Sequence, residues 1–271
     1  MFLPELKELG FPPEYKRKLK ETQMDESGPG TILRDFDTLL DYISERQLRV
    51  TAKQQQLPLS ALPKINARLV RPIEHGLQRP QQKSFPPIHG LYLLARASGL
   101  TYMDTSGKES ILCLDKYVYK FWQRLNPTEK YGTLLETWFL GGWPQILGEG
   151  GVHFLPIPRN FEESVFFFFD IPEKGLQIAG NRDVEFRLPY SPGWHNLGLL
   201  DLFGFIDVQQ GSPEPGEGWR IERVAYTLFG EAILLLLGIE FFGDFDKVTA
   251  LDMQKGMPFG ALQTILLPYF P

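Results

Sequence analysis

Residues 197–237 constrain the fold of this chain more than any other segment. Their apolar side chains first follow helical spacing and then give way to β-prone residues at Gly204, where a helix end favours glycine in the left-handed region. A Gly- and Pro-rich piece then interrupts the β-prone residues and can only be a loop. The predicted elements are a helix ending at Gly204, strands over 205–208 and 219–226 around a loop at 211–216, and a helix over 228–237 that Thr227 caps.

This order of helix, strand, turn, strand and helix is that of the core of a winged-helix unit. The winged helix is mainly a docking fold, for nucleic acid or for protein, and it rarely carries catalytic residues. The segment therefore predicts a class of function, binding, without naming a ligand. The spacing predicts one shared interior for the unit, made of Leu200, Phe203, Ile206, Val224, Leu228 and Leu235.

A similar pattern occurs earlier in the chain. Three times, an apolar helix ends at a β-prone piece and a further helix follows, at 48–50, 99–100 and 204–206. We therefore predict a helix-rich α+β chain of tandem winged-helix or helix-turn-helix-like units. Three further strands are predicted: 111–114, then 165–169, which is Phe-rich and buried on both faces, and 184–188, which alternates and is half exposed.

These patterns divide the chain into six predicted segments. Changes in composition, such as the Pro- and Gln-rich piece after Arg71, mark the divisions. The segments are a lead-in (1–30), a helix-turn-helix-like unit (31–84), a second helical unit (85–142), a β-containing connector (143–190), a winged-helix unit (191–245) and a C-terminal tail (246–271).

Composition argues against several functional classes. A single cysteine, Cys113, rules out an internal disulfide and is typical of a reducing compartment. The four histidines stand in no metal-binding spacing, and no phosphate-binding or nucleophile motif occurs, so we expect no metal, no cofactor and no catalytic residue. The longest apolar run, 232–242, is too short to span a membrane, and charge follows Met1 too soon for a signal peptide. We expect a cytoplasmic protein without a membrane partner.

The net charge of −5 conceals an uneven distribution. Residues 1–130 carry 20 Lys and Arg against 15 Asp and Glu, whereas residues 131–271 carry 8 against 18. The excess of base is concentrated in 46–96, which holds nine basic residues and one acidic residue. Such a segment is the electrostatic footprint that binding of a polyanion requires.

The spacing of the basic residues suggests which of them contact phosphates. Lys64, Arg68 and Arg71 stand at i, i+4 and i+7 along a helix predicted from about Ser60, on the face opposite to its apolar residues. A row of cations on an exposed helix is what phosphate contacts require. With DNA as the expected ligand, the predicted nucleic-acid-binding residues are Arg49, Lys53, Lys64, Arg68 and Arg71.

Two other functions stay open. The segment 194–203 has no Lys or Arg and carries Asp201, so we expect this unit to bind protein or to pack internally rather than to bind a polyanion. The chain is then a scaffold for protein–protein interaction, and its basic stretch keeps it soluble. A third hypothesis is an enzyme whose site lies outside known motifs in 143–190. Whether the bases of 46–96 converge on one surface distinguishes the first two.

Two segments, RDFDTLLDYI at 34–43 and LNPTEKYGTLLETW at 125–138, resemble a known prokaryotic family. Shorter pieces add to this resemblance, at 57–59, 65–66, 259–263 and 268–271. Together they are similar to the N-terminal region of proteins that end in a Ri-plasmid open-reading-frame-three-like domain. More distantly, helix–Gly–Leu patterns resemble the N-terminal winged-helix domains of XPB-type helicases. The resemblance implies a DNA- or partner-binding accessory region.

The signature domain of that family, with its Ile-Trp-Arg-Arg-like start, is absent from this sequence. The C-terminal residues place Phe259, Leu262, Ile265 and Leu266 on one helical face, which needs a cover. We therefore expect the tail either to pack on the winged-helix unit or to lead into a further domain. The resemblance favours the second, because the related proteins continue at this point.

Overall fold

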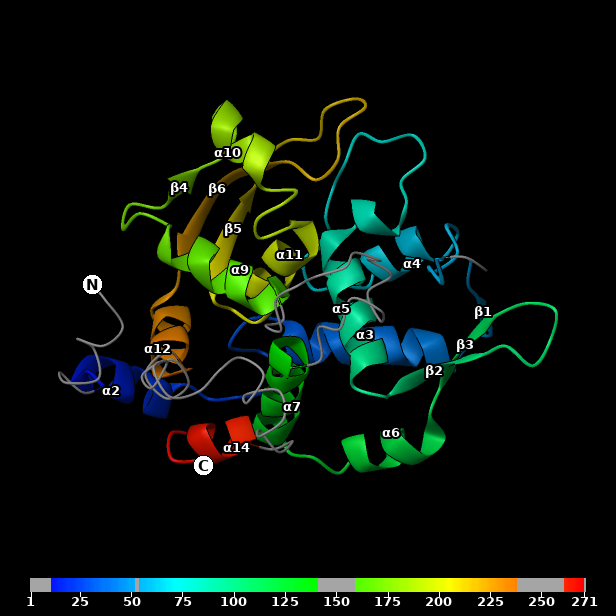
Figure 1. Cartoon of the computed structure of the whole chain (residues 1–271), viewed down its shortest axis with the longest axis horizontal. Coiled ribbons are helices and arrows are strands. Elements are labelled where there is room, and N and C mark those ends of the chain that lie inside the picture. The colour runs from blue at the N-terminus through cyan, green and yellow to red at the C-terminus, as the bar shows by residue number, and fades with distance from the viewer. Residues whose placement is uncertain (1–10, 52–53, 141–158, 238–260, 271) are drawn as a thin grey trace.

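The structure, a computed structural model, describes residues 11–51, 54–140, 159–237 and 261–270 (Figure 1). Helices surround two small antiparallel sheets of three strands each, so the chain belongs to the α+β class, as predicted. No helix in these ranges is long and apolar enough to cross a membrane.

The first sheet belongs to a unit that we call the N-unit, residues 32–114. Its strands lie in the order β1-β3-β2, with Leu48 opposite Leu112 and Thr101 opposite Leu114. Its elements, in chain order, are α3 (Ile32–Ser44), β1 (Leu48–Arg49), α4 (Leu62–Asn66), the 3-10 helix η1 (Gln82–Ser84), α5 (Pro86–Ala97), β2 (Thr101–Asp104) and β3 (Ile111–Leu114).

The second sheet belongs to the C-unit, residues 159–226, which repeats this plan. Both units run helix, strand, helix, helix, strand, strand, and in both sheets the third strand lies between the first and the second. The C-unit elements are α9 (Arg159–Phe169), β4 (Leu176–Gln177), α10 (Arg182–Arg187), α11 (Trp194–Leu202), β5 (Ile206–Gln210) and β6 (Ile221–Tyr226).

The remaining helices flank the two units in Figure 1. Two of them begin at the caps that the sequence indicates: the Thr227 hydroxyl accepts a hydrogen bond from the Gly230 amide, and Asn126 and Glu129 cap each other reciprocally. The flanking helices are α2 (Pro13–Glu21), α6 (Lys116–Trp122), α7 (Pro127–Leu140), α12 (Leu228–Leu237) and α14 (Ala261–Leu266).

The two units meet through their third helices, α5 and α11, which pack against each other. Glycines make the close approach possible. A Cβ atom on Gly90 of α5 would lie 2.8 Å from Cγ of Leu199. A Cβ atom on Gly198 of α11 would lie 3.0 Å from backbone atoms of Pro86 and Pro87. The helix pair therefore forms the centre of one core that both units share.

The predicted order of elements over 197–237 is confirmed. α11, β5, β6 and α12 follow one another, and Gly204 has a φ of 76°, in the left-handed region. Five of the six predicted core residues are buried: Leu200, Phe203, Ile206, Val224 and Leu235. The sixth, Leu228, is exposed, because it is the first residue of α12 and lies at the edge of the core.

The predicted strand at 165–169 is wrong, because this Phe-rich segment is the last part of α9. Phe167 and Phe168 are buried, whereas Phe166 and Phe169 are exposed. A short run that is apolar at every position has no period, so it fits a buried strand and a helix equally well.

The predicted strand at 184–188 is also wrong, because most of it lies in α10. Asn181 precedes the helix, and its side chain accepts a hydrogen bond from the Val184 amide at 3.4 Å. The charged and apolar residues alternate over only a few positions here. An alternation this short is weaker evidence for a strand than a cap three residues before Val184 is for a helix.

Strand pairing crosses two of the predicted domain boundaries. β1 and β3 come from the predicted segments 31–84 and 85–142, yet they are neighbours in one sheet. β4 comes from the predicted connector 143–190, and it joins the sheet of β5 and β6. The helix predicted from Ser60 is also shorter than its apolar spacing indicates, because α4 ends at Asn66.

The tail packs mainly on α7, which the sequence did not indicate as its cover. Leu262, Leu266 and Phe270 are buried, and the Gln263 amide donates to the Thr133 hydroxyl on α7 at 3.1 Å. Phe270 also lies near Phe229 of α12, with 6.4 Å between the ring centroids. The predicted apolar face of the tail is therefore covered within the chain, apart from Phe259, which lies outside the described residues.

Candidate interaction surfaces

The third helices of both units are buried on nearly all sides. Every residue of α5 from Pro86 to Ala95 is buried, and so is every residue of α11 from Asn196 to Leu202. The Asn196 side chain is bonded internally: the Trp138 indole N–H donates to its Oδ1 at 3.1 Å, and its own amide donates to the Pro192 carbonyl at 2.6 Å. These two helices therefore belong to the core and present almost no surface to a ligand.

His89 lies within this helix contact. Its Nδ1 accepts a hydrogen bond from the Gln82 amide at 2.9 Å, and its ring centroid is 5.5 Å from that of His195. Burial lowers the pKa of His89 to about 3, and the charges of His195 and Lys83 add to this effect. The imidazole is therefore neutral at physiological pH and acts as a packing and hydrogen-bonding group.

One ion pair ties the predicted basic row to the other unit. Arg71 donates to the Asp201 carboxylate on α11 at 2.9 Å, and Asp201 is almost fully buried. Burial raises the pKa of Asp201 to about 6, although Arg71 acts in the opposite direction. Arg71 therefore has a structural partner inside the fold.

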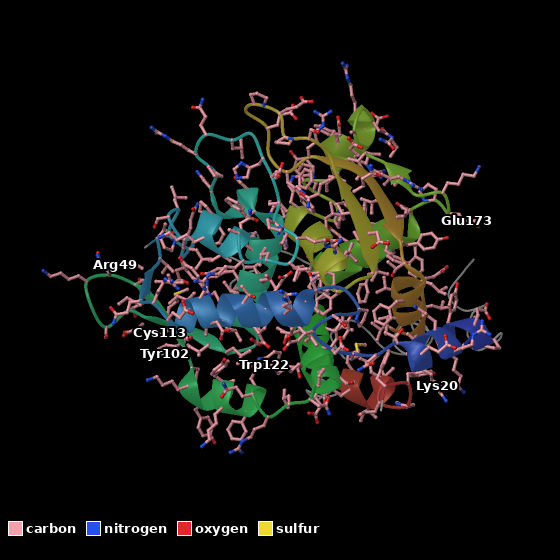
Figure 2. The ribbon with its side chains drawn as sticks, turned by 180° about the vertical axis from the view of Figure 1, so that it is seen from behind. Lys20, Arg49, Tyr102, Cys113, Trp122 and Glu173 are labelled. Atoms are coloured by element: carbon pink, nitrogen blue, oxygen red, sulfur yellow. The ribbon has the colours of Figure 1, made fainter. Side chains whose placement is uncertain are left out.

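Arg49 and Arg68 also pair with carboxylates. Arg49 Nε lies 2.9 Å from Glu109, on the loop between β2 and β3, and Figure 2 shows it at the edge of the N-unit, on the side away from Glu173. Arg68 Nη1 lies 3.5 Å from Glu45, and its guanidinium stands 5.2 Å from the centroid of the Tyr42 ring. Both pairs are exposed, so each stabilises the fold little and is open to exchange.

The predicted helical row of cations does not form. α4 contains Lys64, which is exposed, but the helix ends at Asn66, so Arg68 and Arg71 lie beyond it in turns. Lys53 lies outside the described residues. The three predicted residues Arg49, Arg68 and Arg71 each pair with a different carboxylate. Lys64, Arg68 and Arg71 therefore do not line one helix face.

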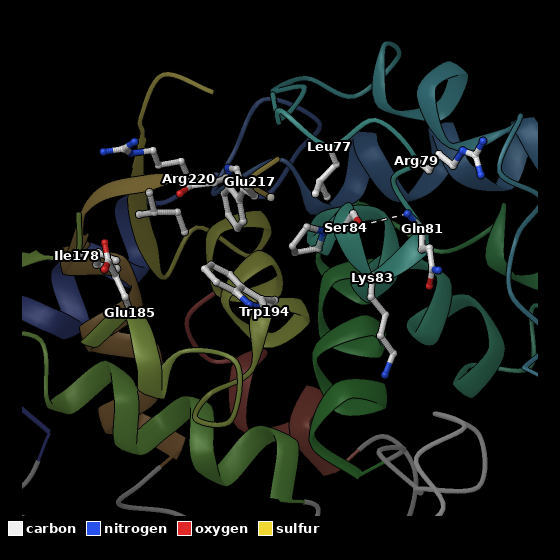
Figure 3. A pocket seen from close by; sticks show the side chains of 14 residues that line it. Leu77, Arg79, Gln81, Lys83, Ser84, Ile178, Glu185, Trp194, Glu217 and Arg220 are labelled. Atoms are coloured by element: carbon white, nitrogen blue, oxygen red, sulfur yellow. Dashed lines mark hydrogen bonds between the residues drawn. The ribbon is translucent and has the colours of Figure 1, made fainter. Parts of the chain in front are cut away.

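A pocket of about 650 Å³ lies where the loop before α5 meets the loop between β5 and β6 (Figure 3). The two loops are tied by hydrogen bonds: Gly76 N–H donates to the Glu217 carbonyl, and Gly216 N–H donates to the Gly76 carbonyl, both at 2.9 Å. Trp194 and Trp219 line the pocket, with their ring centroids 6.4 Å apart. The pocket is thus built from both units.

Charged side chains of both signs complete the lining. Arg79 and Lys83 come from the N-unit, whereas Glu185, Glu217 and Arg220 come from the C-unit. A concave site of this volume, with aromatic walls and a few polar groups, suits a small molecule or an inserted side chain of a partner. Among the described residues, no cluster of His, Cys, Asp and Glu has a geometry that would hold a metal ion.

The end of α10 and the turn that follows it present two aromatic rings to solvent, here called the α10 pair. Phe186 is 75% exposed and Tyr190 is 73% exposed, and their ring centroids lie 6.0 Å apart. Glu185, the neighbour of Phe186 on α10, lines the pocket described above. Adjacent exposed aromatic rings are uncommon on a surface that serves only solubility, and they are enriched where proteins bind one another.

No protein-family model, curated protein or solved structure matches this chain. The similarity to the N-terminal region of the plasmid open-reading-frame-three-like proteins therefore stays a prediction.

Sequence reasoning missed the exposed rings of α10. It placed Phe186 on a half-exposed strand and gave Tyr190 no role. No helical spacing could have paired the two rings, because α10 ends at Arg187 and Tyr190 lies in the turn that follows. The pocket had no sequence signal either, because its lining comes from loops more than 90 residues apart.

Proposed function

We propose that the chain is a non-catalytic protein-interaction module built from two winged-helix units, the N-unit and the C-unit. Support for the fold comes from the shared order of elements, helix, strand, helix, helix, strand, strand, and from the shared order of strands in each sheet. The short loop between the last two strands of each unit corresponds to the wing.

The observation that carries the proposal is the burial of α5 and α11 against each other. In DNA-binding helix-turn-helix proteins the corresponding helix enters the major groove and reads base edges. Here each of these helices is covered by the other, and separating them would expose a continuous apolar surface. Reading of DNA by either helix is therefore disfavoured by the packing itself.

The proposed docking surface is the α10 pair, Phe186 and Tyr190, together with the pocket between the units. Large aromatic side chains supply much of the binding energy in protein interfaces, because they bury wide apolar areas. This surface lies in the acidic half of the chain, where the sequence favours a protein partner over a polyanion. We infer a partner that covers the rings and inserts a side chain beside Trp194.

The nucleic-acid function that the charge pattern predicts stays open beside this proposal. Its support is the excess of base in 46–96 and the exposure of Lys64 on α4. Against it stand the carboxylate partners of Arg49, Arg68 and Arg71.

Site-specific photo-crosslinking in cells tests the protein-interaction function. A benzophenone amino acid at position 186 should give a covalent adduct of defined mass, and the same label at the exposed Leu59 of the N-unit should not. With the captured protein purified, F186S should weaken its binding by about 2 kcal/mol, the loss typical of a central interface aromatic. Equal labelling at both positions, or an F186S affinity within error of the unchanged chain, would contradict the proposal.

A further inference from the structure

The helix α6 joins exposed aromatic rings to exposed cations on its outer side. Tyr117 is 72% exposed and Phe121 is 47% exposed, and their ring centroids lie 4.9 Å apart. Lys116, Lys120 and Arg124 are exposed as well, and the Arg124 guanidinium lies 5.8 Å from the centroid of the Phe121 ring. Cations and rings thus alternate along one short, solvent-facing surface, which we call the α6 face.

The inner side of α6 explains why these rings stay outside. Trp122 is buried against Phe36 of α3, with 5.4 Å between the ring centroids, and its indole N–H donates to Asp37 at 3.0 Å. Val118 packs against the core from the same helix. The core is therefore filled without Tyr117, and burial does not account for the position of this ring.

Three carboxylates lie near α6, and each has another partner. Asp41 of α3 bonds to the Tyr119 side chain, which packs against the core. Asp37 pairs with Lys130 at 3.2 Å and accepts the Trp122 hydrogen bond. Asp115 caps the start of the helix, where it accepts hydrogen bonds from the amides of Tyr117 and Val118. These carboxylates serve internal contacts, so the three cations give the α6 face a positive charge.

We propose that the α6 face binds single-stranded nucleic acid, with bases stacked on Tyr117 and Phe121 and phosphates held by Lys116, Lys120 and Arg124. Exposed rings interleaved with cations are the chemistry by which proteins bind single strands without reading their sequence. The positive charge of the α6 face favours a polyanion as its ligand. An anionic membrane is a weaker fit, since a seven-residue helix with two exposed rings offers little apolar area to a bilayer.

This site lies apart from the residues that the sequence predicted. Lys64 belongs to α4, and Arg68 and Arg71 follow it in turns, whereas α6 follows β3. In Figure 1 α6 lies at the outer edge of the molecule, with α4 on the other side of α3 and the sheet. The two candidate sites can therefore be disabled one at a time.

Fluorescence anisotropy of the full chain with labelled 20-nucleotide poly(dT) and poly(U) tests the proposal. Removal of both rings in Y117S/F121S should weaken binding at least about tenfold, because each stacked base contributes to affinity. Loss of two cations in K116Q/K120Q should reduce the slope of log affinity against log salt by about 1.4, the value for two contacts to a single strand.

Two matched controls fix the interpretation. Y102S removes an aromatic side chain that is 51% exposed on β2, and K64Q/R68Q removes two cations of the predicted row; both should leave affinity within about twofold. The proposal is overturned if the unchanged chain binds neither oligonucleotide at low salt, or if Y117S/F121S binds as well as the unchanged chain. It is also overturned if K64Q/R68Q lowers the affinity more than Y117S/F121S does. A further contradicting result is a chain that binds phosphatidylserine vesicles but neither oligonucleotide, with the vesicle binding abolished in Y117S/F121S. Unchanged melting temperatures in all four variants show that each of them folds.

Discussion

Asp201 shows how one side chain in the contact between the units acquires an unusual environment. It stands on a helix whose neighbours are almost all apolar, so its carboxylate has lost most of its hydration. Arg71 compensates only in part, because its guanidinium is itself partly exposed to water. The desolvation that Arg71 does not offset raises the pKa of Asp201 to about 6. The folded chain therefore binds a proton at Asp201 more readily than the unfolded chain does.

That shift predicts a pH dependence for the free energy of unfolding. Between the ordinary carboxyl pKa near 3.8 and about 6, the folded state holds more protons at Asp201 than the unfolded state. The stability of the unchanged chain relative to D201N should therefore fall as pH rises across this window, by at most about 3 kcal/mol, and stay constant above it. Asparagine keeps the acceptor oxygen for Arg71. Urea titrations of both chains at pH 4.5, 5.5 and 7 measure the difference, and a constant difference would show that Asp201 is not shifted.

At the scale of elements, the pairing of α5 with α11 depends on two residues without side chains. Gly90 and Gly198 bring the helix axes close, and leucine side chains fill the space around them. Glycine within a helix costs about 1 kcal/mol relative to alanine when nothing else is changed. The position of both glycines at a helix contact indicates that close packing outweighs this cost.

We therefore expect alanine at either position to destabilise the protein, although alanine favours helix. In G90A the new methyl group meets Leu199 at 2.8 Å, and in G198A it meets the backbone of Pro86 and Pro87 at 3.0 Å. Each change should lower the free energy of unfolding by about 1–3 kcal/mol, as overpacking does. G132A on α7 is the matched control, since its methyl group meets side-chain atoms alone, Gln263 Cγ at 3.3 Å and Leu266 Cδ1 at 3.8 Å. In thermal unfolding, G132A should have a higher melting temperature than G90A and G198A. The reverse order would refute the close packing of the two helices.

The elements that could be predicted are those with local signals. Thr227 and Asn126 stand at helix starts, Gly204 at a helix end, and each signal acts within a few residues. The Phe-rich part of α9 carried no period, so its conformation depended on packing that lies outside the segment. The ion pairs of the predicted basic row and the lining of the pocket depend on residues far apart in sequence, which composition and spacing do not place.

Across the whole molecule, the two units are joined by polar links as well as by the core. Arg71 of the N-unit pairs with Asp201 of the C-unit at 2.9 Å. Residues that flank the N-unit also bond to the C-unit: the Thr31 amide donates to the Leu202 carbonyl at 2.8 Å, and the Tyr131 hydroxyl of α7 donates to the Phe203 carbonyl at 2.7 Å. The loop before α5 pairs with the loop between β5 and β6 through Gly76. Separate unfolding of either unit would break all of these contacts and expose the third helix of the other unit.

The units should therefore unfold together. Tryptophan fluorescence and far-ultraviolet circular dichroism should give the same urea midpoint, since Trp122 is close to the N-unit and Trp194 and Trp219 lie in or beside the C-unit. Y131F, which removes the hydrogen bond between the flanking helix α7 and the C-unit, should shift both midpoints equally, by a loss of about 1 kcal/mol. Two separate transitions, or a shift of only one signal, would mean that the units are independent.

The shared helix contact also affects synthesis of the protein on the ribosome. α5 is apolar on nearly all sides, yet the helix that covers it is translated roughly a hundred residues later. At about 5–20 residues per second, this interval lasts on the order of 5–20 seconds. Throughout it the newly made N-unit carries an uncovered apolar helix, which is the kind of surface that nascent-chain chaperones bind. Folding of the first unit is thus coupled to the translation of the second.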